Sequence, residues 1–91
     1  MYPTEEELQT IAEWPYTDLK GLMDYVRERW EYADVGYWKQ EENTYYISTA
    51  GWSGNEEIIQ ALRKNHMFWT LCWYRSERGG HYKFVLPKNI K

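Results

Sequence analysis

Ninety-one residues form one domain, residues 1–91, and the single cysteine excludes an intrachain disulfide and a cysteine-based zinc site. A formal net charge of −3 argues against nonspecific binding to nucleic-acid phosphates, and nothing in the sequence resembles a signal peptide or a membrane span. Six tryptophans, nine tyrosines and two phenylalanines supply a dense core. So short a chain buries only about 60–65% of its unfolded surface, so some rings must stay exposed, as is typical of contact surfaces.

Charge is divided unevenly along the chain. Residues 1–46 hold eleven acidic and four basic residues, a net charge of −7, whereas residues 47–91 hold three acidic and seven basic residues, a net charge of +4. In one interpretation the two halves attract each other within the domain. In the other, an acidic helical face meets a basic partner.

Two helices are predicted in the first thirty residues. Thr4 and Glu7 form a capping box at the start of the first helix, and Pro15 ends that helix at about Trp14. The second helix starts at Thr17 and Asp18. Its apolar stripe, with a period of about 3.6 residues, consists of Leu19, Leu22, Met23, Val26 and Trp30.

A hairpin follows, with strands over residues 35–40 and 44–49 that are rich in aromatic and β-branched side chains. A two-residue turn at Glu42-Asn43 would place Trp38 opposite Ile47 on one face of the hairpin. The other face would carry Tyr37, Tyr46 and Ser48.

The hairpin runs into a strand-to-helix corner, Gly51-Trp52-Ser53-Gly54-Asn55-Glu56-Glu57. Ser53 and Glu56 match a second capping box, so we expect a third helix over residues 55–64, with Asn65 in a left-handed position at its end. Because Trp52 belongs to no periodic apolar face, we expect it to be partly exposed and to border a polar pocket rather than to plug the core.

Residues 67–75 alternate between two largely apolar faces and are predicted to form the central strand of the sheet. Residues 76–80 turn the chain, and residues 81–86 return as a strand that Pro87 ends. The predicted fold class is α+β: a four-stranded, mostly antiparallel sheet of two hairpins with three helices, in the order ααββαββ.

Motifs for metal binding and catalysis are weak. His66 and His81 lie far apart, so no metal site is predicted, and no cofactor is expected. The Gly-Trp-Ser-Gly of residues 51–54 misses the nucleophile elbow by one position and lacks the lysine of a phosphate-binding loop. His81 is the one possible base near a turn. The candidate nucleophiles are Ser48, Thr49, Ser53, Cys72 and Ser76.

The turn over residues 75–81 holds more charge than a hairpin needs. Its arginines, next to aromatic residues, could hold a carboxylate, a phosphate or a stacked ring, although a solvated hairpin tip is the alternative. We predict a shared binding pocket at one end of the sheet, formed by Ser48, Thr49, Trp52, Asn55, Glu56, Arg75, Arg78 and His81. These residues would converge only if the strand after the third helix pairs beside the strand before it.

A long motif runs through residues 47–86. It comprises Ile47-Ser48-Thr49-Ala50-Gly51-Trp52-Ser53-Gly54-Asn55-Glu56-Glu57, then Phe68-Trp69 and Cys72-Trp73, then Ser76-x-Arg78-Gly79-Gly80-His81-Tyr82. This motif resembles a family of small phage-encoded proteins of unknown function. The resemblance implies a viral gene product acting inside a bacterial host, and it brings no reaction, cofactor or catalytic residue with it.

The expected function follows from this resemblance and from the weak catalytic signals. We expect a non-enzymatic phage protein in the host cytoplasm that binds a host or phage macromolecule, a protein rather than a nucleic acid, as host-takeover and anti-defence inhibitors do. One alternative is a small enzyme or anionic-ligand module that uses Ser48, Glu56, Arg78 and His81. Another is nucleic-acid binding through the basic second half. No membrane partner is expected, and the sequence does not predict an oligomeric state.

Overall fold

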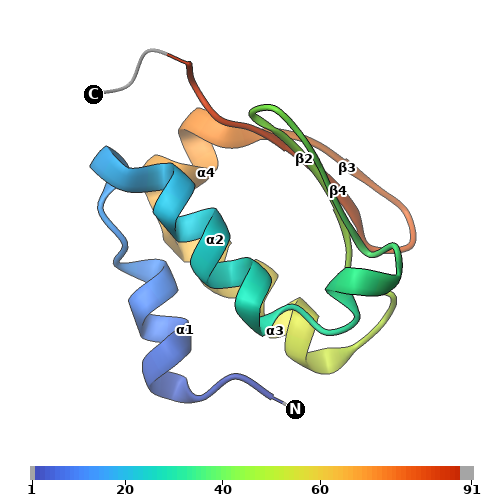
Figure 1. The fold of residues 1–91 in the computed structure, drawn as a ribbon. Helices are drawn as coiled ribbons and strands as arrows, with labels where there is room; N and C mark the ends of the chain where they lie inside the picture. The colour runs from blue at the N-terminus through green and yellow to red at the C-terminus, as the bar shows by residue number, and fades with distance from the viewer. Residues whose placement is uncertain (1, 89–91) are drawn as a thin grey trace.

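A four-stranded antiparallel sheet packs against a layer of helices in the computed structural model, which describes residues 2–88 (Figure 1). The elements in chain order are α1 (Glu5–Ala12), the 3-10 turn η1 (Tyr16–Asp18), α2 (Leu19–Arg29), the 3-10 turn η2 (Ala33–Val35), β1 (Trp38–Glu41), β2 (Thr44–Ser48), α3 (Ser53–Lys64), α4 (His66–Cys72), β3 (Trp73–Glu77) and β4 (His81–Val85). The predicted α+β class and four-stranded sheet are confirmed. The prediction of three helices was wrong, because a fourth helix changes the order to ααββααββ.

Local capping rules account for the two N-terminal helices. The Thr4 hydroxyl accepts the Glu7 N–H at 3.0 Å, and the Glu7 carboxylate accepts the Thr4 N–H at 2.9 Å, so the first capping box is confirmed. Asp18 accepts the Gly21 N–H at 3.0 Å and caps α2. Glu7 also accepts from Arg29 Nε at 3.0 Å, which ties the start of α1 to the end of α2.

Strand order in the sheet is β1-β2-β4-β3, with every neighbouring pair antiparallel. The predicted register of the first hairpin is confirmed, since Trp38 pairs with Ile47. Its first strand starts later than predicted, because residues 33–35 form η2. The central position beside β2 belongs to β4, and β3 is an edge strand.

The predicted central strand over residues 67–75 was wrong. Residues 66–72 form α4, whose buried side chains Phe68 and Cys72 are four residues apart and so share one helical face. Asn65 selects the helix: its side chain accepts the Phe68 N–H at 3.1 Å and donates to the carbonyls of Ile11 and Trp14 at 2.9 and 3.0 Å. Its φ is −83°, so the predicted left-handed position was also wrong.

The second predicted capping box, between Ser53 and Glu56, is not formed. Trp52 is the residue before α3 and Ser53 is already helical, with no side-chain hydrogen bond at this cap. The reason lies in the preceding turn, where Ala50 and Gly51 have φ of +53° and +77° and the Trp52 N–H donates to the Thr49 carbonyl at 2.9 Å. This tight turn brings the chain into the helix earlier than the capping box requires.

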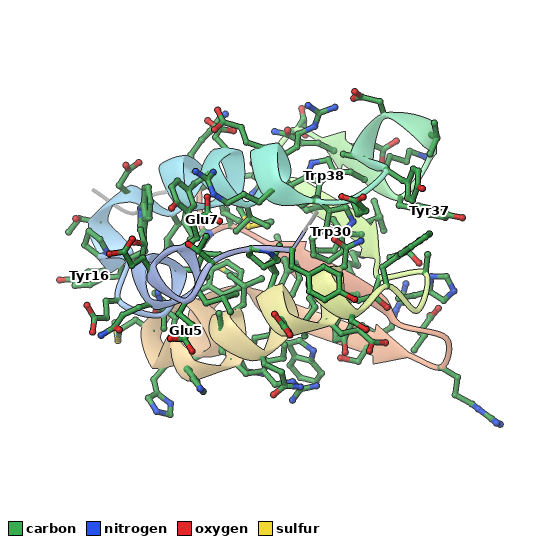
Figure 2. The ribbon with its side chains drawn as sticks, turned by 90° about the horizontal axis from the view of Figure 1, so that it is seen from below. Glu5, Glu7, Tyr16, Trp30, Tyr37 and Trp38 are labelled. Carbon is green, nitrogen blue, oxygen red and sulfur yellow. The ribbon has the colours of Figure 1, made fainter. Side chains whose placement is uncertain are left out.

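The inner face of the sheet and the helices share one core. Trp38 packs edge-on against Trp30 from the end of α2, with ring centroids 5.7 Å apart (Figure 2). The buried apolar side chains of the sheet are Trp38, Tyr45, Ile47 and Phe84, and they face Leu22, Met23, Val26, Ile58, Ile59 and Leu62 of α2 and α3. Within residues 2–88, all helices lie on this one side of the sheet, which leaves the outer face open (Figure 1). None of these helices is long and apolar enough to cross a lipid bilayer.

Candidate functional site

The two segments of the predicted pocket meet at one end of the sheet. Ser48 at the end of β2 pairs directly with His81 at the start of β4, and the Thr49 N–H donates to the Gly80 carbonyl at 2.9 Å. The predicted convergence required the strand that follows the third helix to pair beside the strand before that helix, which is β2. This condition was wrong. The strand that pairs beside β2 is β4, after both α4 and β3.

A groove of about 440 Å³ lies on the outer face of the sheet at this end. Of the eight predicted site residues, Ser48, Arg75 and His81 line it. They are joined by side chains that the sequence analysis did not select: Tyr37, Lys39, Tyr46 and Lys83. The hairpin alternation did place Tyr37, Tyr46 and Ser48 on one face, which was the signal available for this groove.

Thr49 and Asn55, also predicted as binding residues, are buried, each with only 1% of its surface exposed. The Asn55 side chain accepts the Glu31 N–H at 2.8 Å and donates to the Glu31 carbonyl at 3.3 Å and the Thr49 carbonyl at 3.5 Å. Asn55 therefore joins the loop after α2 to the turn before α3. Thr49 and Asn55 therefore support the site from the interior of the fold and do not present a surface to a ligand.

Trp52 is partly exposed, as predicted, with 44% of its surface accessible. Its ring packs against Tyr32, which is 47% exposed, with centroids 5.1 Å apart and planes at 47°. Trp52 does not itself line the groove. The ring centroids of Tyr32 and Tyr37 lie 6.4 Å apart, and Tyr37 lines the groove. A row of rings therefore connects the Tyr32–Trp52 pair to the groove.

Both loops that carry this pair have a constrained backbone. Among residues 2–88, the non-glycine residues with positive φ are Tyr32 at 61°, Glu42 at 57° and Ala50 at 53°. A left-handed conformation costs a non-glycine residue roughly 1–2 kcal/mol. Tyr32 and Ala50, which lie in the two loops of the aromatic pair, therefore need support from their surroundings. The Asn55 side chain bonds to the backbone of Glu31, next to Tyr32, at 2.8 and 3.3 Å, and to the Thr49 carbonyl, next to Ala50, at 3.5 Å.

Charge is segregated between the two layers. Residues 2–36 contain nine acidic and three basic residues, and each of these bases is paired within the same segment: Lys20 with Asp24, Arg27 with Asp34 and Arg29 with Glu7. Ion pairs on the sheet are likewise local, Lys39 with Glu41 and Arg75 with Glu77. Among residues 2–88, no ion pair joins residues of the first half to residues of the second.

Catalytic chemistry finds little support in this geometry. Glu56 is exposed in the first turn of α3, Arg78 is exposed at the tip of the last hairpin, and the His81 ring lies against the backbone at Gly79. Within residues 2–88, no hydrogen bond or ion pair joins any two of the side chains Ser48, Glu56, Arg78 and His81. Cys72 is buried, and burial raises the pKa of its thiol to about 12, so it is not a reactive thiolate near neutral pH.

The described part of the chain also contains no group of three or more His, Cys, Asp or Glu side chains placed to hold a metal ion. Comparisons of the sequence and the structure with protein-family models, curated proteins and solved structures find no significant match. The functional argument therefore depends on the geometry of this end of the sheet.

Proposed function

We propose that this chain is a small non-enzymatic binding protein whose main contact with a protein partner is the Tyr32–Trp52 pair. The observation that carries the proposal is that two exposed rings pack against each other on loops that the buried Asn55 side chain joins. Each ring is nearly half exposed, their centroids lie 5.1 Å apart, and the Asn55 side chain makes hydrogen bonds to the backbone of Glu31 in one loop and of Thr49 in the other.

Rigid, exposed aromatic side chains suit a binding hot spot. Tyr and Trp are enriched among the residues that dominate binding energy, and they lose little conformational entropy when they are already fixed. The strained backbone at Tyr32 and Ala50 supports the same conclusion, since strain of this kind concentrates at functional sites. Ser48 and His81 are cross-strand partners, but no hydrogen bond or ion pair among residues 2–88 joins any two of the side chains Ser48, Glu56, Arg78 and His81, which favours binding over catalysis.

The resemblance of residues 47–86 to small phage-encoded proteins gives the proposal a biological setting. In that setting the chain acts in the cytoplasm of an infected bacterium, and its partner is a host or phage protein that it blocks or redirects. The exposed acidic side of α1 and α2 favours a partner with a basic rim around the contact.

The test compares three versions of the chain as bait in a bacterial lysate: wild type, Trp52→Ala and Tyr16→Ala. Tyr16 is the matched control, because it is 46% exposed and lies at the opposite end of the molecule from Tyr37 (Figure 2). We expect wild type and Tyr16→Ala to retain the same partner. Loss of a hot-spot tryptophan raises Kd by about 30-fold or more, which corresponds to ~2 kcal/mol.

Stability must be measured on the same proteins by thermal unfolding. Since Trp52 is half outside the core, Trp52→Ala is expected to unfold within a few degrees of wild type. A loss of ~3–5 kcal/mol would mean that Trp52 is a core residue, and equal capture by all three proteins would remove the pair from the binding surface.

A further inference from the structure

The open face of the sheet combines aromatic rings with basic side chains. Tyr46 lies in the middle of this face, with the ammonium of Lys39 from β1 at 6.0 Å and that of Lys83 from β4 at 5.4 Å from its ring centroid. Lys83 lies 4.3 Å from the ring of Tyr74 on the edge strand. Rings and cations therefore alternate across the four strands, and they flank the groove that also contains Arg75.

This face has more positive than negative charge. Its carboxylates, Glu41 and Glu77, are each engaged by a neighbouring base, whereas Lys83 has no carboxylate partner among residues 2–88. Arg78 adds a further positive charge at the adjoining hairpin tip. The ion pairs of Lys39 with Glu41 and of Arg75 with Glu77 are both exposed, so an incoming anion can replace them at little cost.

The net charge of −3 does not describe what a ligand meets here. The acidic residues of α1 and α2 belong to the layer on the other side of the sheet, and the shortest extent of the molecule is 21 Å. That is about twice the Debye length of ~10 Å at 0.1 M salt, so the helical charges are largely screened at the open face at that concentration; at 25 mM the Debye length is about 20 Å and the screening is partial.

From this arrangement we infer that the open face of the sheet binds single-stranded nucleic acid. A nucleotide supplies both groups that the face complements, a phosphate for Lys39, Arg75 and Lys83 and a flat base for Tyr46 or Tyr74. An acidic peptide supplies the charge without the ring. A duplex keeps its base faces stacked and out of reach, so the strand must be single. This inference is independent of the proposed protein contact at Tyr32 and Trp52.

The test measures fluorescence anisotropy of end-labelled dT12 and U12 with the full chain, at salt concentrations from 25 to about 200 mM. With Lys39, Arg75 and Lys83 on phosphates, the plot of log K against log salt should have a slope of about −2, from ~0.7 for each neutralised phosphate. Tyr46→Ala should weaken binding by about 5- to 150-fold, the equivalent of ~1–3 kcal/mol for a stacked base. Tyr46→Phe keeps the ring and should bind within a factor of about two of wild type.

The charge contribution has its own matched pair of variants. Lys83→Ala should weaken binding several-fold, while Lys20→Ala, which removes a lysine from the acidic helical layer, should leave binding unchanged. Three results would overturn the inference: no saturable binding of either strand at 25 mM salt, equal loss in both lysine variants, or equal binding of poly-glutamate. Trp52→Ala should not affect these affinities, so failure here is distinguishable from failure of the proposed protein contact.

Discussion

Asn55→Ala offers the sharpest test of how the aromatic pair is held. The substitution removes the acceptor of the Glu31 N–H at 2.8 Å and the donor to the Glu31 carbonyl at 3.3 Å. Two bonds of ordinary net value contribute about 2 kcal/mol, and stranding the partly buried Glu31 N–H adds about 1 kcal/mol. The contact with Thr49 at 3.5 Å is too long to add much. The expected loss in the free energy of unfolding is about 3 kcal/mol.

Urea unfolding followed by circular dichroism measures this loss directly. For a domain of this size, 3 kcal/mol lowers Tm by roughly 12–24 °C. Gln60→Ala is the control, because Gln60 is exposed on the same helix, and it should change stability by less than about 0.5 kcal/mol. A loss below about 1 kcal/mol for Asn55→Ala would refute the claim that this side chain stabilises the loop that carries Tyr32. Asn55→Ala is also expected to weaken partner binding at temperatures where the variant is still folded. Without the hydrogen bonds, the loop of Tyr32 spends less time in its binding conformation, which lowers the apparent affinity.

Three further predictions test other parts of the fold. Gly80 has a φ of +80°, and a Cβ there would overlap the Thr49 hydroxyl. Gly80→Ala should therefore lower the free energy of unfolding, measured in urea, by about 2–4 kcal/mol. A variant as stable as wild type would contradict the overlap. The buried Tyr45 hydroxyl has no hydrogen-bond partner within residues 2–88, and burial raises its pKa, so Tyr45→Phe should gain about 1 kcal/mol, whereas a loss of that size would reveal a partner. The Thr4 N–H lowers the pKa of Glu7 below its usual 4.5, so this carboxylate stabilises the fold above that pH, and the stabilisation is lost as pH falls through the folded pKa. The stability difference between wild type and Glu7→Gln should therefore shrink in acid, and a difference that stays constant from pH 7 to pH 3 would be the contrary result.

Local chemistry predicts the elements whose determinants are neighbours in sequence. The Thr4–Glu7 capping box and the first hairpin, with Trp38 opposite Ile47, follow from spacing alone. Helix α4 does not, because a segment of seven residues with five apolar side chains suits a strand or a helix equally well. The deciding contacts are those of Asn65 with the carbonyls of α1 and the following loop, more than fifty positions away along the chain, and no local pattern encodes them.

The candidate site shows the same division. The sequence predicts Ser48, Arg75 and His81 as site residues, and all three line the groove. It does not predict the strand order that brings them together there. Trp52 could be predicted as exposed because it belonged to no periodic face. Its partner Tyr32 lies in an irregular loop with a left-handed backbone, where neither spacing nor propensity gives a signal.

The layered fold explains the uneven charge of the two sequence halves. If the halves neutralised each other, ion pairs would join them, yet every pair among residues 2–88 lies within one half. The topology instead places the acidic helices on one side of the sheet and the cationic face on the other. Added salt then weakens nucleic-acid binding on the open face without unmaking the fold, because the exposed pairs contribute little to stability. The aromatic pair lies where these two surfaces meet, so a protein partner that engages it would come within reach of both.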